Sequence, residues 1–154
     1  MQSVLGLISG IAVAVLTSSI DGSQAAQLSC SQVIQEFDRF PKSLELIECK
    51  PAKSSQLKTL KARYRVEGDR ATAVEKFLHR EYGLPALRFI CCGWSGMTGS
   101  ENGQPTHGRA VYEDANANYY EIRMMSAETL ITDRQQWSDI PWFYVTVTAF
   151  LEMP

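Results

Sequence analysis

The most apolar stretch after residue 26 runs from Leu87 to Trp94, and its pattern predicts a strand. Side chains alternate between the two faces of a strand. The two sides then comprise Leu87, Phe89 and Cys91 on one face, and Ile90, Cys92 and Trp94 on the other. Because both faces carry apolar groups, we expect this strand to be central and buried on both sides.

Two segments show helical spacing of apolar residues. In the first, Ser29 and Gln32 can form a capping box, and Pro41 ends the helix. The second begins with Asp69 as N-cap and ends at Gly83. The apolar stripes consist of Cys30, Val33, Ile34 and Phe37 in the first helix, and of Ala71, Val74, Leu78 and Tyr82 in the second.

Period-two alternation predicts further strands. They cover residues 44–49, 60–66, 109–113, 119–125 and 142–151, with a short helical turn at 133–138. In 60–66 the basic residues Lys61, Arg63 and Arg65 alternate with apolar ones, which is typical of a strand with one solvated face. Residues 95–107, from Ser95 to His107, are rich in Gly, Ser, Asn and Thr, and predict a long loop.

These elements predict an α+β fold: a single antiparallel sheet of about six strands with two main helices on one face. The second helix connects strand 60–66 to strand 87–94 as a crossover. A right-handed crossover places strand 87–94 beside strand 44–49.

The N-terminal 26 residues have the pattern of a signal peptide. An apolar run from Val4 to Leu16 is too short to span a bilayer and is followed by the small residues Ser23, Ala25 and Ala26. The absence of Lys and Arg before Arg39 departs from the usual pattern, and an uncleaved anchor is the alternative. We expect residues 1–26 to be removed and residues 27–154 to form one domain, without a membrane span, in the periplasm or outside the cell.

Composition narrows the range of partners. The formal net charge is −2, so no basic surplus indicates a nucleic-acid partner. In an exported chain, four cysteines are more often disulfides than metal ligands. We expect no metal, no cofactor and no catalytic residue. The sequence does not predict an oligomeric state.

The strand assignments favour one pairing of the cysteines. Cys30 and Cys91 both belong to the core face, whereas Cys49 and Cys92 belong to the opposite face of neighbouring strands. The predicted disulfides are therefore Cys30–Cys91 and Cys49–Cys92, because a bond between the adjacent residues Cys91 and Cys92 closes a strained ring.

No known catalytic motif is present. The chain has no glycine-rich phosphate loop, no His-Glu-x-x-His and no Cys-x-x-Cys. A cysteine hydrolase would need His79 or His107 as its base, and we expect both histidines to be dispensable.

Three functions from different classes remain. The favoured one is a non-catalytic protein-binding module, such as an inhibitor or a toxin-immunity protein. A structural or accessory envelope protein is the alternative, and a thiol-dependent hydrolase is less favoured. The candidate binding residues lie in the loop and on an aromatic strand face: Trp94, Glu101, His107, Trp142 and Tyr144. Alternatively, the three aromatic residues among them simply pack beneath the first helix or residues 133–138.

Two motifs carry a family resemblance. They are the Cys-Cys-Gly-Trp run at residues 91–94 and the Ile-Pro-Trp-Phe-Tyr-Val run at residues 140–145. With them, most of the mature chain resembles a family of small exported bacterial proteins catalogued only as a domain of unknown function. The resemblance implies export and a single domain, and it implies no activity, cofactor or catalytic residue.

Overall fold

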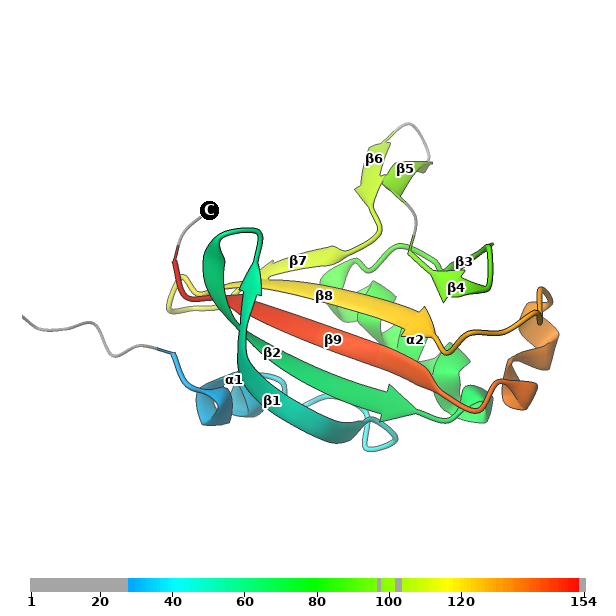
Figure 1. The fold of residues 1–154 in the computed structure, drawn as a ribbon, viewed down its shortest axis with the longest axis horizontal. Coiled ribbons are helices and arrows are strands. Elements are labelled where there is room, and N and C mark those ends of the chain that lie inside the picture. The colour runs from blue at the N-terminus through cyan, green and yellow to red at the C-terminus, as the bar shows by residue number, and fades with distance from the viewer. Residues whose placement is uncertain (1–27, 97, 102–103, 153–154) are drawn as a thin grey trace, which may run out of the picture.

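Helices α1 (Cys30–Glu36) and α2 (Gly68–Tyr82) lie behind a seven-stranded antiparallel sheet in the view of Figure 1. This computed structural model describes residues 28–96, 98–101 and 104–152, with only the backbone described at 98–101 and 104–107. The strands of the sheet are β1 (Glu45–Ser54), β2 (Leu57–Val66), β3 (Arg88–Ile90), β4 (Gly93–Ser95), β7 (Ala110–Glu113), β8 (Tyr119–Ser126) and β9 (Phe143–Phe150).

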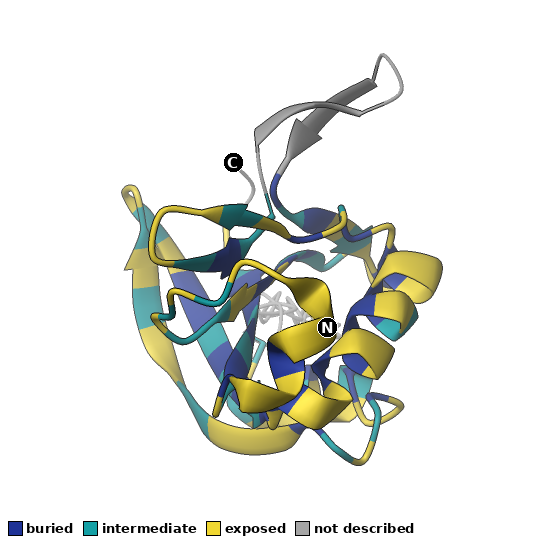
Figure 2. Cartoon of the chain, turned by 90° about the vertical axis from the view of Figure 1, so that its right-hand side faces the viewer, coloured by how far each residue is buried: buried dark blue, intermediate teal, exposed yellow. Residues whose placement is uncertain are grey.

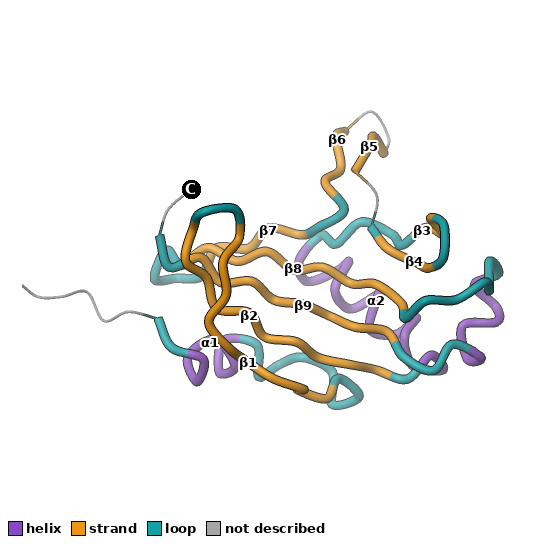
Figure 3. The backbone as a smooth tube through the Cα atoms, viewed as in Figure 1, coloured by secondary structure: helices purple, strands orange, loops and turns teal. Residues whose placement is uncertain are grey.

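The order of strands across the sheet is β1-β2-β9-β8-β4-β3, and β7 pairs with β8 beside β4. The prediction of an α+β fold with an antiparallel sheet is confirmed, with seven strands rather than about six. Two further strands, β5 (Thr98–Glu101) and β6 (Gln104–His107), form a separate hairpin where a loop was predicted. Figure 3 shows the helices on one side of the strands.

The prediction of a central strand at residues 87–94 is wrong. The chain turns at Cys91 and Cys92, so that β3 and β4 form a short hairpin at one edge of the sheet. Cys92 has a left-handed backbone conformation, with φ of 70°, which ends the extended run. The edge position also contradicts the prediction that this segment lies beside β1, since three other strands, β2, β9 and β8, separate β3 and β4 from β1.

The core lies between the sheet and the helices, as the dark blue residues of Figure 2 show. On β9, Phe143, Val145 and Val147 are fully buried, which confirms the predicted alternation of that strand. Val33 of α1 and Phe37, the C-cap of that helix, pack inward, and the Phe37 ring meets Tyr120 of β8 edge to face, with ring centroids 5.2 Å apart.

Both helix boundaries follow from local chemistry. The capping box at Ser29 and Gln32 is present as predicted. Helix α2 has Glu67 rather than Asp69 as its N-cap, and it ends at Gly83, whose φ of 70° forms the predicted left-handed stop. The predicted turn near residues 133–138 is a 3₁₀ helix, η1 (Arg134–Asp139), capped by the Asp133 side chain.

A β-bulge interrupts strand β1. Leu46 pairs with Tyr64 and Glu48 pairs with Arg63, so Ile47 is an extra residue that reverses the face on which later side chains lie. As a result Cys49, opposite Ala62, faces the core side together with Leu46. The predicted placement of Cys49 on the opposite face from Leu46 is therefore wrong.

The bulge explains the disulfide that forms. Cys30 of α1 is bonded to Cys49, with the two Cα atoms 5.8 Å apart, and Cys91 and Cys92 are exposed and free. The predicted pairs Cys30–Cys91 and Cys49–Cys92 are both wrong. Two causes combine: the bulge brings Cys49 to the side of α1, and the strand order puts Cys92 at the far edge of the sheet.

The predicted signal peptide, residues 1–26, lies outside the described residues. Within the part of the chain that the structure describes, no helix is sufficiently long and apolar to cross a membrane.

Candidate protein-binding surface

The face of the sheet opposite α1 and α2 is formed by side chains that alternate with the core residues. We call it the uncovered face. Residues paired directly across strands share a face, so it can be followed row by row. One row runs Glu48, Arg63, Thr146 and Arg123, and the next runs Glu45, Arg65, Tyr144, Met125, Ser95 and Arg88.

Arginines of β2 pack against aromatic rings that lie beside them on this face. The Arg63 guanidinium carbon lies 5.4 Å from the centre of the Tyr144 ring, and that of Arg65 lies 4.4 Å from the centre of the Trp142 ring. Cation–π contacts of this kind are worth about 0.5–1 kcal/mol when exposed. We call these four residues the arginine–aromatic patch.

Ion pairs with β1 hold the arginines of the patch in place, and the patch remains accessible. The Arg63 and Arg65 side chains are 42% and 44% exposed, and they form ion pairs with Glu48 and Glu45 of β1 at 3.6 and 2.9 Å. A hydrogen bond from Lys50 lowers the pKa of Glu48, with a smaller contribution from Arg63. Because exposed ion pairs contribute little to stability, carboxylates of a partner can replace these glutamates at small cost.

The two rows carry a local positive charge. They contain four arginines, Arg63, Arg65, Arg88 and Arg123, and two glutamates, Glu45 and Glu48. The whole chain has a formal net charge of −2, so these two rows differ in sign from the molecule as a whole.

Two of the predicted binding residues, Trp142 and Tyr144, lie together in the patch, and the other three lie elsewhere. Trp94 is only 6% exposed, and its ring meets Trp137 of η1 edge to face at 5.1 Å. It therefore packs beneath η1, as the alternative interpretation held. The side chains of Glu101 and His107 lie outside the described part of the chain, and only their strands, β5 and β6, are placed.

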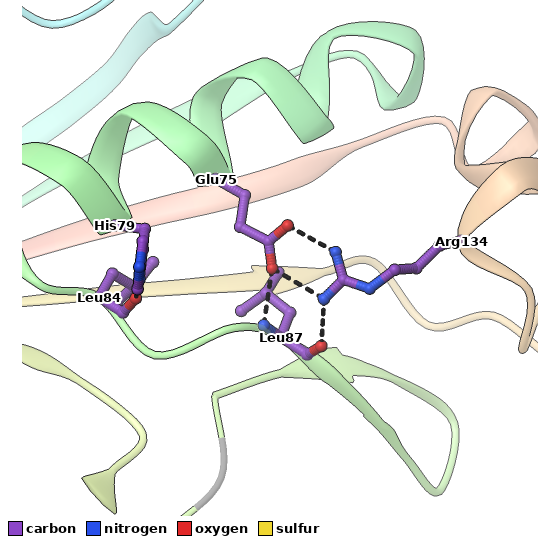
Figure 4. A network of polar contacts seen from close by, with 5 residues as sticks. All are labelled: Glu75, His79, Leu84, Leu87 and Arg134. Carbon is purple, nitrogen blue, oxygen red and sulfur yellow. Dashed lines mark hydrogen bonds and ion pairs between the residues drawn. The ribbon is translucent and has the colours of Figure 1, made fainter. Parts of the chain in front are cut away.

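A buried carboxylate, Glu75, holds the region around Trp94 together (Figure 4). It accepts hydrogen bonds from the Leu87 backbone N–H at 2.7 Å and from both terminal nitrogens of Arg134 at 2.6 and 2.9 Å. Arg134 also donates to the Leu87 carbonyl, and its guanidinium lies over the Trp94 and Trp137 rings. Glu75 is not among the residues predicted from the sequence, although a carboxylate on the apolar stripe of α2 is a signal of a buried partner.

A polar groove of about 310 Å³ lies between α1 and the turn that joins β7 to β8. Its two carboxylates already have partners. Burial favours a raised Asp114 pKa, but hydrogen bonds from the side chain and backbone of Asn118 outweigh it and hold this pKa below its usual value. Glu36 accepts a hydrogen bond from Tyr112 at 2.6 Å, which with burial raises the pKa of Tyr112 to about 12. The groove is thus a structural junction.

The His79 side chain contacts the backbone at the end of its own helix. Its Nδ1 lies 2.8 Å from the Leu84 carbonyl oxygen, just after α2 (Figure 4). Among the residues with described side chains, no group of three or more His, Cys, Asp or Glu residues is arranged to hold a metal ion.

Comparison with known proteins gives a resemblance to one family and no activity. No curated protein and no solved structure matches the chain. The model of a domain of unknown function, DUF4952, matches residues 19–94, which run through α1, β1, β2, α2 and β3 to Trp94. The match includes the Cys-Cys-Gly-Trp run and stops before residues 140–145. Over residues 19–94 the chain therefore resembles the DUF4952 family of domains of unknown function.

Proposed function

We propose that the protein is an exported, non-catalytic protein-binding module whose uncovered face binds an acidic surface of a partner protein. One observation carries the proposal: Arg63 and Arg65 lie over the rings of Tyr144 and Trp142 on the sheet face that the helices leave free. An inhibitor or an immunity protein against a secreted toxin belongs to this class.

The residue types of the patch are those that dominate protein interfaces. Trp, Tyr and Arg account for most of the residues whose truncation strongly weakens binding. Here three of the four patch residues project from the paired strands β2 and β9, and Trp142 lies immediately before β9. A patch that is already ordered loses less side-chain entropy on binding, which leaves more of the contact energy for affinity.

The charge of the face indicates the chemistry of the partner. Four arginines against two glutamates attract carboxylates, and complementary charge raises the rate of association more than it raises affinity. We therefore expect a partner rich in Asp and Glu, bound less rapidly as salt concentration rises.

The Cys30–Cys49 disulfide supports the proposed export, since structural disulfides form and persist in oxidising compartments. Removal of residues 1–26 as a signal peptide belongs to the same proposal. N-terminal sequencing of the protein recovered from the periplasm tests it, with a first residue near Gln27 expected.

The binding test compares charge removal on the two faces of the molecule. The protein and two double variants are used to capture partners from periplasmic extract. Arg63→Gln/Arg65→Gln alters the patch, and Arg70→Gln/Lys76→Gln removes the same charge from exposed positions of α2. We expect the first variant to bind the captured partner at least about tenfold more weakly, a change of about 1.4 kcal/mol, and the second to bind it normally.

Two further readouts decide between this proposal and its alternatives. The captured partner should carry an acidic surface, and its association rate should fall with salt. Equal binding by both double variants, at unchanged thermal stability, would contradict the assignment of the patch. Release of the protein only together with envelope fragments would instead support a structural envelope role.

A further inference from the structure

We propose that Cys91 and Cys92 form a thiol–disulfide exchange site, a dithiol that oxidises to a disulfide between the two adjacent residues and is reduced again by external thiols. The proposal is independent of the protein-binding function above. It concerns the opposite end of the sheet from β1, at the tip of the β3–β4 hairpin.

The fold brings the two sulfur atoms together. Ile90 pairs with Gly93, so Cys91 and Cys92 are the two residues of the hairpin turn. Their Sγ atoms are 2.7 Å apart, closer than two sulfur atoms approach in ordinary non-bonded contact, and both residues are exposed. Oxidation therefore requires only a small further approach, and external reagents can reach the pair.

The turn is held in an unusual backbone conformation. Cys92 has φ of 70°, which residues other than glycine seldom adopt and which is found repeatedly at functional sites. Neighbouring segments fix it: the Thr129 N–H donates to the Cys92 carbonyl at 2.9 Å, and the Trp94 N–H donates to Ser126 Oγ at 2.8 Å. Strand β8 and the segment that follows it thus hold the turn in the geometry that brings the thiols together.

A bond between adjacent residues is expected to be readily reduced. Neighbouring Cα atoms are about 3.8 Å apart across a trans peptide, below the range of about 4.4–6.8 Å that is usual for disulfides. Such strain makes a disulfide more easily reduced. Cys30 and Cys49, by contrast, have Cα atoms 5.8 Å apart, within that range. The chain would then contain one structural and one labile disulfide.

The exchange balances with a low-molecular-weight disulfide as oxidant. The Cys91 thiolate attacks one sulfur of the oxidant, which forms a mixed disulfide and releases one thiolate. Cys92 then loses its proton to solvent and attacks Cys91 Sγ, which closes the bond and releases the second thiol. Two electrons pass from the cysteine pair to the oxidant.

The electrostatics of the pair agree with this order of attack. Contact with the Cys91 sulfur raises the pKa of the Cys92 thiol, and the negative charge of Glu128 adds to the effect. This direction of the shift favours Cys92 as the thiol that attacks second, after the mixed disulfide has formed.

The test uses oxidised and reduced glutathione as the probe. The protein is equilibrated in buffers of increasing glutathione disulfide content, quenched with an alkylating reagent, and analysed by intact mass and peptide mapping. We expect Cys91 and Cys92 to be alkylated in reducing buffer. In oxidising buffer we expect them to be linked to each other without a glutathione adduct, while Cys30–Cys49 stays intact throughout.

Two variants separate the sulfur chemistry from the shape of the turn. Cys92→Gly keeps a residue that adopts positive φ and removes one sulfur, so Cys91 should accumulate as a stable glutathione adduct. Ala117→Gly makes the same kind of backbone change in the β7–β8 turn, where φ is 61°, and should leave the oxidation of Cys91 and Cys92 unchanged. If Cys92→Gly does not fold, Cys92→Ser serves the same purpose.

Persistent glutathione adducts on the wild-type protein, or only linkages between separate molecules, would overturn the proposal. It would also fail if both thiols were alkylated in the most oxidising buffer. An adduct-free linkage of Cys91 to Cys92 that forms and reverses with the buffer would establish it.

Discussion

Glu75 shows how a single carboxylate can join parts of the chain that are distant in sequence. It belongs to α2, yet its partners are the backbone of Leu87 and the side chain of Arg134. Arg134 in turn covers the indole rings of Trp94 and Trp137. The helix, the start of the β3–β4 hairpin and η1 are fixed to one another through these two side chains.

Removal of the two partners should have unequal effects. Arg134→Met leaves the Glu75 carboxylate buried and unpaired, whereas Glu75→Gln leaves a guanidinium that is 40% exposed and retains an acceptor for Leu87. We expect the free energy of unfolding to fall by about 3–4 kcal/mol for Arg134→Met and by about 1–2 kcal/mol for Glu75→Gln. Urea denaturation measures both.

A control arginine marks the baseline for these variants. Arg80 pairs with Glu81 on the exposed side of α2, so Arg80→Met should change the unfolding free energy by less than about 0.5 kcal/mol. A smaller effect for Arg134→Met than for Glu75→Gln would contradict the assignment of Glu75 as the buried partner.

At the scale of elements, the β7–β8 hairpin depends on the chemistry of its turn. Ala117 has φ of 61° and no glycine is present, so side-chain hydrogen bonds must stabilise the turn. Asp114 supplies them: its oxygens accept from the Asn116 and Asn118 N–H groups at 2.8 and 2.9 Å and from the Tyr120 hydroxyl at 3.0 Å.

The turn should make stability depend on pH. Because the folded-state pKa of Asp114 is lowered, its carboxylate stabilises the fold above the unfolded-state pKa of about 3.9, and the contribution disappears as pH falls through the folded value. Asp114→Asn should therefore lower the unfolding free energy by about 1–3 kcal/mol at pH 7 and by much less near pH 2.

Unfolding with guanidinium chloride at several pH values measures these free energies. Glu113→Gln, a charge removal at the exposed residue before Asp114, should cost less than about 0.5 kcal/mol at any of them. A constant deficit for Asp114→Asn from neutral to acid pH would show that hydrogen-bond geometry, rather than charge, stabilises the turn.

Elements governed by local signals could be predicted from the sequence. Ser29 and Gln32 marked the start of α1, Gly83 the end of α2, and the alternation of Phe143, Val145 and Val147 gave the buried face of β9. The predictions failed where a single residue interrupts the alternation of a strand and its residue type gives no indication of this. Ile47 reverses the parity of β1, and Cys92 turns the chain in a run that reads as a continuous strand.

The candidate surface was predicted only in part for a similar reason. Trp142 and Tyr144 follow from the period of β9, and the arginines opposite them were recognised as an exposed row. Their juxtaposition, however, depends on the pairing of β2 with β9, which are about eighty residues apart in the chain and connected by no local pattern. The strand order also determines which cysteines can pair, since it places Cys91 and Cys92 far from Cys49.

At the scale of the whole molecule, the Cys30–Cys49 bond holds the N-terminal helix to β1, the strand at one edge of the sheet. It closes a loop across a sequence separation of 19 residues. On the chain-entropy model such a loop contributes about 3 kcal/mol, mainly by restricting the unfolded chain.

Replacement of both residues, Cys30→Ala/Cys49→Ala, should lower the unfolding free energy by about 3 kcal/mol. The matched variant Cys91→Ser/Cys92→Ser removes two exposed thiols and should change it by less than about 0.5 kcal/mol under reducing conditions. Differential scanning calorimetry with and without reductant measures both. Equal destabilisation by the two pairs would contradict the structural role assigned to Cys30–Cys49.

The bulge at Ile47 has a consequence beyond the position of Cys49. Strand β1 is a free edge of the sheet, and both the bulge and Pro51 interrupt the regular row of backbone donors that another strand would need. The opposite margin consists of β3 and β7, which have only three and four residues. Neither margin is a good template for a strand from another chain, so we expect the protein to resist self-association into extended sheets. Recognition by this molecule must then be specified by side chains.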